Sequence, residues 1–223
     1  MITFLSGCFV AKEGLGLVLP AIFLTLVLWF LFWLNNHTAI LFLAVIFSVS
    51  TVLLIFFFRD PKRIIPGGEN LILSPADGRV DEIEKLSSAS FLETAAIRVS
   101  IFMSLFDVHI NRLPISGEVK YIEHKSGKSL PAFKKESAKE NEQTEIGIDN
   151  LSFRVILRQM VGFTARRIIC HLKVGDKVKI GERFGMIKFG SRAELLLPQN
   201  VEIEVNLGDR VKAGETIIGI FKR

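Results

Sequence analysis

A Gly-Ser dipeptide, Gly190-Ser191, stands between two β-like apolar runs about thirty residues before the C-terminus. Alone, this pair is typical of a hairpin turn, because glycine tolerates φ > 0 and serine hydrogen-bonds its own backbone. The same residues also permit a reaction, since a serine hydroxyl can attack the preceding carbonyl and glycine has no side chain to block it. The peptide becomes an ester, β-elimination cuts the chain, and hydrolysis leaves a pyruvoyl ketone, an electron sink for amines. Ser191 is therefore a candidate for self-cleavage and for a covalent pyruvoyl cofactor.

The other metal-binding and redox-active residue types show no comparable pattern. The chain has four histidines and two cysteines. His37, His124 and His171 lack the spacing of metal ligands, so we assign them no role and expect no metal site. Cys8 and Cys170 are too few and too far apart for a disulfide framework, which is typical of a reducing compartment.

Short β-like segments separated by glycine follow Pro66-Gly67-Gly68. Residues 71–73, 97–102, 153–157 and 201–205 are the clearest strands, and the last of them alternates apolar and charged residues with a period of two. We therefore expect a mostly β domain in this part of the chain.

The β-like region contains an internal repeat. Residues 174–182 match residues 207–215, and each copy has the order strand, Gly-Asp turn, strand, Gly-Glu turn. Gly-x-Val strand starts at residues 78–80 and 117–119 accompany the two copies. The pattern resembles the two halves of the biotinyl/lipoyl carriers, so we expect a lipoyl-like β-barrel or flattened sandwich.

This resemblance also supplies an alternative function, a membrane-tethered carrier domain. A carrier presents a modifiable lysine at the tip of the hairpin that joins its halves, and Lys188 lies near that place. Carriers usually flank this lysine with small or acidic residues and methionine, whereas here the tip reads Lys-Phe-Gly-Ser-Arg. A carrier acylated or biotinylated on Lys188 would be an intact chain whose mass rises by the prosthetic group.

Two apolar runs precede the β-like region. Residues 15–34 and 38–58 contain no charged residue, and each is long enough to cross a hydrocarbon core of about 30 Å as a helix. Residues 35–37 between them allow only a tight reversal. A signal peptide has a shorter apolar core and would not be followed at once by a second span. We therefore predict a membrane-anchoring helical hairpin in residues 1–58 and a separate domain in residues 59–223.

Basic residues flank this hairpin on one side only. Lys12 precedes the first run, Arg59, Lys62 and Arg63 follow the second, and the linker has no Lys or Arg, so both ends are expected in the cytoplasm. The first 58 residues hold one Lys and one Glu, so the formal net charge of +5 belongs to residues 59–223. A basic domain on a bilayer attracts anionic headgroups. The tether argues against nucleic acid as a partner.

Three segments follow the hairpin in order: residues 74–80 (SPADGRV), 102–114 (FMSLFDVHINRLP) and 184–192 (FGMIKFGSR). Together they resemble the short, membrane-hairpin form of the phosphatidylserine decarboxylase family. An archaetidylserine decarboxylase would show much the same pattern. Each segment alone is weak evidence for this family, but three segments in this order and spacing are specific to it. The resemblance covers residues 59–223.

The resemblance implies an activity. Gly190-Ser191 would be the self-cleavage bond, which divides the chain into a β chain, residues 1–190, and an α chain, residues 191–223. Ser191 would become the pyruvoyl group of the α chain. This group would form a Schiff base with phosphatidylserine, and loss of CO2 would give phosphatidylethanolamine. No metal or dissociable cofactor would be required.

Two more residues match the family's pattern. Asp77 matches the acidic residue of the maturation apparatus, and His109 matches the histidine beside the pyruvoyl group. An imidazole can protonate a carbanion at neutral pH, and an Asp-oriented imidazole is the usual base for serine attack. Without the family match, Asp77 is by default a turn residue and His109 a structural histidine. We expect Asp107 and Asn111 to make local backbone hydrogen bonds.

One position departs from the family. Longer members carry a second histidine three residues after the first, credited with activating the serine, and this chain has Arg112 there. Arginine cannot deprotonate serine at neutral pH. Either His109 serves in both steps or Asp77 acts in another way.

The resemblance also implies partners and a location. The substrate would be an anionic aminophospholipid, and the α and β chains of one precursor would form a heterodimer, with a higher homo-oligomer also open. The catalytic domain would lie on the cytoplasmic side of the inner membrane.

Overall fold

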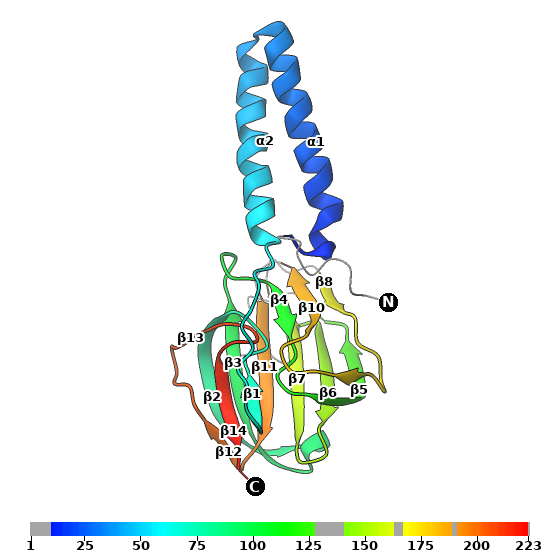
Figure 1. Ribbon diagram of the computed structural model, residues 1–223, viewed down its shortest axis with the longest axis vertical. Coiled ribbons are helices and arrows are strands. Elements are labelled where there is room, and N and C mark those ends of the chain that lie inside the picture. Colours follow the sequence, from blue (N-terminus) through cyan, green and yellow to red (C-terminus); the bar gives the residue numbers. More distant parts are fainter. Residues whose placement is uncertain (1–9, 128–140, 163–166, 189–190, 223) are drawn as a thin grey trace. The chain divides into compact units, whose positions relative to one another are not determined.

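We describe a computed structural model of the chain, in which residues 10–127, 141–162, 167–188 and 191–222 are placed. The chain forms two compact units, Met1–Lys62 and Arg63–Arg223. The first unit is helical and the second is built from β-strands (Figure 1).

The first unit contains two helices, α1 (Lys12–Asn35) and α2 (Thr38–Phe57), close to the predicted spans. Asn36 takes the left-handed conformation (φ 50°) that ends α1, and the His37 ring accepts a hydrogen bond from the Ala39 amide at the start of α2. The tight reversal predicted for the linker is thus confirmed.

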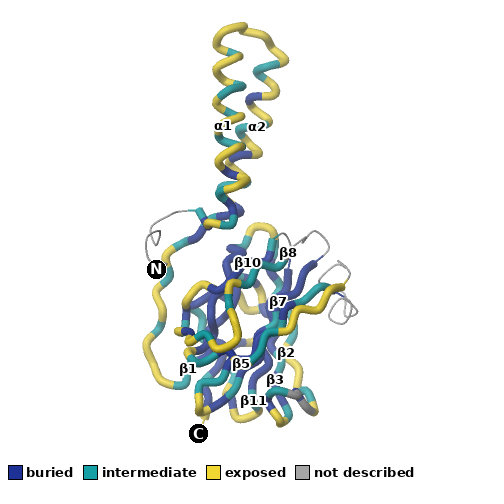
Figure 2. Tube along the Cα trace, turned by 90° about the vertical axis from the view of Figure 1, so that its right-hand side faces the viewer, coloured by how far each residue is buried: buried dark blue, intermediate teal, exposed yellow. Residues whose placement is uncertain are grey.

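Polar side chains join the two helices where they face each other. Thr25 Oγ1 lies 2.9 Å from Thr51 Oγ1, and Trp29 Nε1 donates to Ser48 Oγ at 2.9 Å. Many of the other side chains are large, apolar and exposed, and exposed residues are yellow in Figure 2. Both helices are long and apolar enough to cross a membrane, so they suggest membrane association.

The second unit consists of short and long strands with one 3₁₀ turn, so the expected mostly β class is confirmed. The strands are β1 (Leu71–Leu73), β2 (Gly78–Ala89), β3 (Thr94–Met103), β4 (Ile110–Arg112), β5 (Gly117–Lys125), β6 (Gln143–Asp149), β7 (Arg154–Val161), β8 (Arg167–Cys170), β9 (Lys177–Val178), β10 (Arg183–Lys188), β11 (Ser191–Pro198), β12 (Val201–Ile203), β13 (Arg210–Val211) and β14 (Ile217–Phe221), with η1 (Ser90–Leu92) between β2 and β3.

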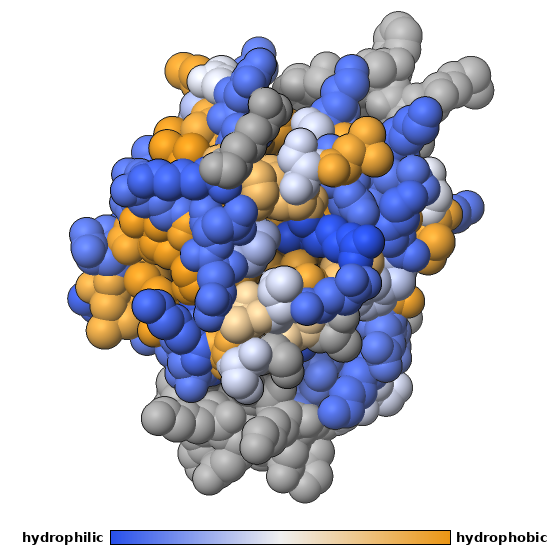
Figure 3. Space-filling view, turned by 90° about the horizontal axis from the view of Figure 1, so that it is seen from below, coloured by the Kyte–Doolittle hydropathy of each residue, from blue (hydrophilic) through white to orange (hydrophobic). Residues whose placement is uncertain are grey.

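These strands form one large and two small antiparallel sheets. The large sheet has the order β13-β2-β3-β11-β7-β6-β5-β9 and curls into half a barrel, while β1-β14-β12 and β4-β10-β8 form the small sheets. One continuous apolar core includes residues of all three sheets, and the strands are correspondingly dark in Figure 2. On the face drawn in Figure 3, hydrophilic and apolar side chains are interspersed.

The sequence repeat is also a structural repeat. Gly175 and Gly208 both have positive φ (91° and 95°), and their amides donate to Val119 and Val80 respectively at 2.8 Å. Asp176 and Asp209 each close the turn by accepting from a backbone amide three residues earlier. The two copies therefore adopt the same turn, although the wider likeness to lipoyl carriers stays a prediction.

The interpretation of Gly190-Ser191 as a hairpin turn is wrong. β10 pairs with β4 and β8 in a small sheet, whereas β11 lies between β3 and β7 in the large sheet. Both edges of β11 are already paired, so β10 cannot join it. The chain changes sheets at this point, and Gly190 itself lies outside the described residues.

Candidate active site

Ser191 is the first residue of β11 and is fully buried. It lies opposite Met103 on β3 and Val161 on β7, and its Oγ donates to the sulfur of Met103 at 3.2 Å. Arg192, on the other face of β11, forms an ion pair with Asp81 of β2. Pairing on both edges and this ion pair hold the start of β11 in place.

His109 comes just before β4 and is also fully buried. Its Nδ1 lies 2.9 Å from the carbonyl oxygen of Asp107, and its own carbonyl accepts from the Ile187 amide at 3.4 Å. The Asp107 carboxylate in turn accepts hydrogen bonds from the amide and hydroxyl of Ser104, which closes the turn after β3. The structure thus places His109 beside the end of β10, from which the chain continues to Ser191.

Asp77 precedes β2 and is held by two groups. Arg63 Nη2 donates to its Oδ2 at 2.6 Å, and the Ala213 amide donates to its Oδ1 at 2.8 Å. Burial raises the pKa of Asp77 above its ordinary value, while the Ala213 and Arg63 hydrogen bonds oppose that rise. The charge of Asp107 adds a smaller increase, which places Asp77 near the turn that supports His109.

Arg63 also bonds a second carboxylate. Its Nη1 donates to Glu215 Oε2 at 3.2 Å, and the Ile64 amide donates to Glu215 Oε1 at 3.1 Å. The Ile64 hydrogen bond is the main reason that the pKa of Glu215 lies below its ordinary value. Arg63 therefore connects the turn before β2 to the turn before β14.

Arg112, at the position of the missing histidine, is buried at the end of β4, where its Nη1 donates to the Gly181 carbonyl at 3.0 Å. This bond joins β4 to the second turn of the first repeat copy. Among the described residues, no three His, Cys, Asp or Glu side chains come close enough together to hold a metal ion.

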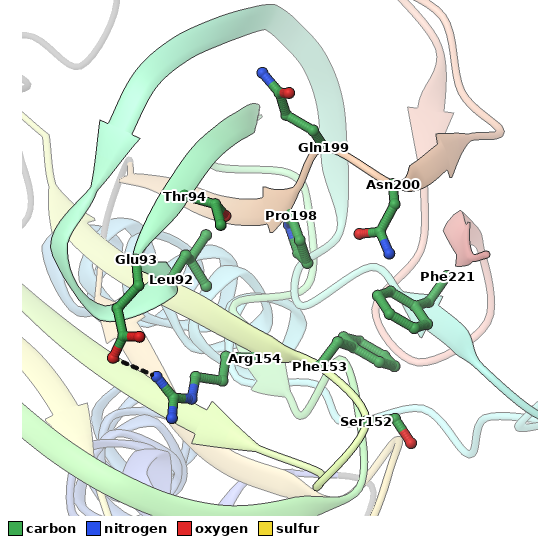
Figure 4. Close-up of a pocket in the computed structure, with 10 residues that line it drawn as sticks. All are labelled: Leu92, Glu93, Thr94, Ser152, Phe153, Arg154, Pro198, Gln199, Asn200 and Phe221. Carbon is green, nitrogen blue, oxygen red and sulfur yellow. Dashed lines mark hydrogen bonds and ion pairs between the residues drawn. The ribbon is translucent and has the colours of Figure 1, made fainter. Parts of the chain in front are cut away.

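A pocket lies at the opposite end of β11 from Ser191. It has a volume of about 540 Å³, and the Glu93–Arg154 ion pair and the stacked rings of Phe153 and Phe221 form much of its wall (Figure 4). Pro198 also lines it, and seven residue steps along a strand separate Pro198 from Ser191 by roughly 23 Å. The pocket is therefore separate from the candidate site.

Comparison with known proteins decides the family. The family model for phosphatidylserine decarboxylase matches residues 51–219. The chain belongs to the phosphatidylserine decarboxylase family. It is therefore a decarboxylase of phospholipid biosynthesis, as the three ordered segments indicate.

Curated relatives agree with this assignment, and each is called a phosphatidylserine decarboxylase proenzyme. The protein from Chlorobium phaeobacteroides is 46% identical over 79% of this chain and 84% of its own length. The relative from Carboxydothermus hydrogenoformans is 45% identical over 86% of each chain. That from Geotalea uraniireducens is 42% identical over 95% of this chain and 96% of its own.

Two buried polar residues of this decarboxylase, Asn111 and Gln159, were not predicted as site residues. Asp107 makes the expected local hydrogen bonds, but the expectation for Asn111 is wrong, because its Nδ2 donates to the distant Pro75 carbonyl at 3.3 Å. Its Oδ1 accepts from Gln159 Nε2 at 2.9 Å. The signal for Asn111 was present, since an asparagine in a short buried strand needs a hydrogen-bond partner.

Proposed function

We propose that this chain converts phosphatidylserine to phosphatidylethanolamine and CO2 with a pyruvoyl group that it makes from Ser191. Membership of the family supports the reaction. The observation that carries the assignment to Ser191 is its position as the first residue of a central strand, buried and oriented, where the chain passes from one sheet to another.

In the proposed maturation, Ser191 Oγ bonds to the carbonyl carbon of Gly190 and the Gly190–Ser191 C–N bond breaks, which gives an ester. Loss of the Cα proton then breaks the Cβ–Oγ bond and releases Gly190 as a carboxylate. Addition of water to the new N-terminus expels ammonia and leaves a ketone at residue 191. Each step uses only this chain and water.

The surroundings of Ser191 fit such a group. Gln159 Oε1 is a buried acceptor without a hydrogen-bond donor among the described residues, and the amine of phosphatidylserine is a donor. A pyruvoyl group supplies a carbonyl that binds this amine and withdraws electrons from the bond to the carboxylate. We assign to His109 the delivery of a proton to the substrate Cα after CO2 has left.

The base for maturation has two candidates, His109 and Asp77. His109 is supported by its place beside the chain that leads to Ser191. Asp77 is supported by its raised pKa, since a carboxylate that holds a proton more tightly is a better base. The Arg63 ion pair argues for a structural role of Asp77 as well.

The division into a β chain, residues 1–190, and an α chain, residues 191–223, is compatible with a stable heterodimer. β11 would start the α chain while pairing along its length with β3 of the β chain, and β7 would flank its other edge. β14 would likewise pair with β1. Backbone hydrogen bonds and shared core would hold the two chains together.

We further propose that residues 1–58 anchor the enzyme in the inner membrane with the catalytic part, residues 59–223, on the cytoplasmic side. The two apolar helices and the basic residues that flank them support this topology. The substrate would be drawn from the same bilayer.

A carrier modified on Lys188 has less support. Lys188 is the last residue of β10 and pairs with Arg167 of β8, so it does not stand at the tip of a hairpin between paired strands. The family comparison also favours the decarboxylase.

Intact mass spectrometry of the purified full chain tests the proposal. We expect two chains that end and begin at residues 190 and 191, with residue 191 carrying a ketone. Ser191→Ala should give one uncleaved and inactive chain, because no hydroxyl remains to attack Gly190. Ser100→Ala, a change of another fully buried serine on the neighbouring strand β3, should still be cleaved. Cleavage of Ser191→Ala, or a single intact chain carrying a group on Lys188, would refute the proposal.

A further inference from the structure

A chain of polar contacts crosses the core to the hydroxyl of Ser191. Gln159 and Asn111 are fully buried and joined by the 2.9 Å hydrogen bond from Gln159 Nε2 to Asn111 Oδ1. Asn111 Nδ2 lies 4.0 Å from the sulfur of Met103, and the same sulfur accepts the Ser191 hydroxyl at 3.2 Å. The contacts therefore run without a gap from Gln159 to Ser191.

The register explains why these residues meet. Ser191 faces Val161 on β7, so Gln159, two residues before Val161, is its diagonal neighbour on the same face, about 7 Å away. Asn111 comes from β4 in the small sheet, on the other side of the core. The amide pair thus connects the two sheets at the end of β11 where Ser191 lies.

Stability alone explains this pair poorly. A buried amide hydrogen bond adds only about 1 kcal/mol, while a buried polar atom without a partner costs about 1–3 kcal/mol. Gln159 Oε1 is such an atom among the described residues. Methionine and leucine, close in size to glutamine and asparagine, would fill the same space with no polar atom to satisfy. A functional reason for the pair is therefore needed.

We propose that Asn111 and Gln159 are a positioning pair that acts through the Met103 sulfur to orient the Ser191 hydroxyl for self-cleavage. A methionine side chain has three rotatable bonds, and the Asn111 amide restricts where its sulfur can lie. The sulfur then accepts the Ser191 hydroxyl and holds its rotamer. Orientation of a nucleophile before attack increases its rate. This inference rests on the proposed function, because it takes Ser191 as the attacking residue.

The rate of self-cleavage, followed by gel or intact mass as the full chain is synthesised in the presence of lipid, tests the pair. We compare Asn111→Leu, Gln159→Met, the double variant and Met103→Leu, and measure the melting temperature of each. We expect at least tenfold slower cleavage in all four, including Met103→Leu, which keeps the volume and removes the sulfur.

The double variant separates positioning from packing. Either single change leaves one amide without its partner and should lower the melting temperature, whereas the double change removes both amides and should restore it. A purely structural pair would then regain fast cleavage in the double variant. We expect the double variant to melt like the wild type and still cleave slowly. Cleavage within twofold of the wild-type rate would overturn the inference, and the same result for Met103→Leu would overturn the role of the sulfur.

Two controls keep this result distinct from a failure of the proposed function. Thr144→Val removes a buried hydroxyl directly opposite Gln159 on β6, the side away from β11, and should leave the cleavage rate unchanged. Ser191→Ala must remain uncleaved. If Ser191→Ala is cleaved, the proposed function fails. If it is uncleaved while the double variant matches the wild type, only the positioning pair fails.

Discussion

The two ends of strand β11 are built differently. At one end Ser191 is fully buried between β3 and β7, with a sulfur as the acceptor of its hydroxyl. At the other end Pro198 lines an open pocket whose wall carries an exposed ion pair and stacked aromatic rings. The candidate reactive residue Ser191 lies at the buried end, which we call the closed end, and the pocket lies at the open end.

The closed end suits a reaction within one chain. Self-cleavage needs no ligand to enter, because the attacking hydroxyl and the carbonyl belong to adjacent residues. Burial of Ser191 also limits hydrolysis of the ester, which would cut the chain without forming a ketone. The pocket at the other end of β11 is therefore not required for the proposed self-cleavage.

The largest effect is expected for His109 at the closed end. His109→Ala should lower decarboxylation of phosphatidylserine by 100-fold or more, because the proton donor for the substrate Cα is lost. His124→Ala, which changes a half-exposed histidine of β5, should leave the activity nearly unchanged.

Intact mass of His109→Ala also resolves the maturation base. A cleaved but inactive protein would confine His109 to decarboxylation and favour Asp77 for maturation. An uncleaved protein would give His109 both roles. Full decarboxylase activity in His109→Ala would contradict the assignment.

A smaller effect, on stability, is expected where Arg63 bonds the carboxylates of Asp77 and Glu215. The pKa of Glu215 is lowered on folding, so its stabilising contribution is present above pH 4.5 and disappears as the pH falls through the lower folded value. Glu215→Gln should therefore lower stability near pH 7 by about 1 kcal/mol, and the difference should vanish in acid. Thermal melting of the uncleaved Ser191→Ala chain between pH 3.5 and 7 measures this.

Replacement of Asp77 should change the pH dependence of stability in the opposite direction, measured in the same melting experiment. Its folded pKa is raised above 3.8, so its contribution to stability is greatest below pH 3.8 and is lost as the pH rises through the folded value. Asp77→Asn should therefore gain stability relative to its parent as the pH increases. If the melting temperatures of Asp77→Asn and Glu215→Gln, each relative to the parent, changed equally with pH, the two carboxylates would not be in different environments.

The smallest effect is expected at the open end of β11. Arg154→Ala removes the ion pairs with Glu93 and Asp149 but is remote from Ser191. Self-cleavage and decarboxylation should stay within twofold of the wild type, measured by intact mass and CO2 release. A tenfold loss of either would show that the two ends of β11 are functionally linked.

Local patterns predicted a large part of this molecule. The two helices follow from unbroken apolar composition, and the repeat turns follow from Gly-Asp pairs whose conformation is set by their own residues. Ser191 and His109 are candidates because short motifs around them carry the family resemblance, and their roles stay predictions.

Long-range pairing was not predictable in the same way. Gly190-Ser191 suits a hairpin locally, and only the pairing of β11 with β3 and β7 excludes one. Gln159 lies between Arg158 and Met160 and has the sequence character of an outward polar residue. Its inward direction follows from its register opposite Ala193, which no local pattern contains.

The placement of β11 in the middle of the large sheet also bears on how the enzyme would respond to denaturation. As a precursor, the chain can refold by a first-order process, because β11 is covalently attached to β10. After cleavage at residue 190, the segment with β11, β12, β13 and β14 would be a separate molecule. Recovery would then be second order, and the stability of the mature enzyme would depend on its concentration. Dilution would therefore lower the stability of the mature enzyme but not that of its precursor.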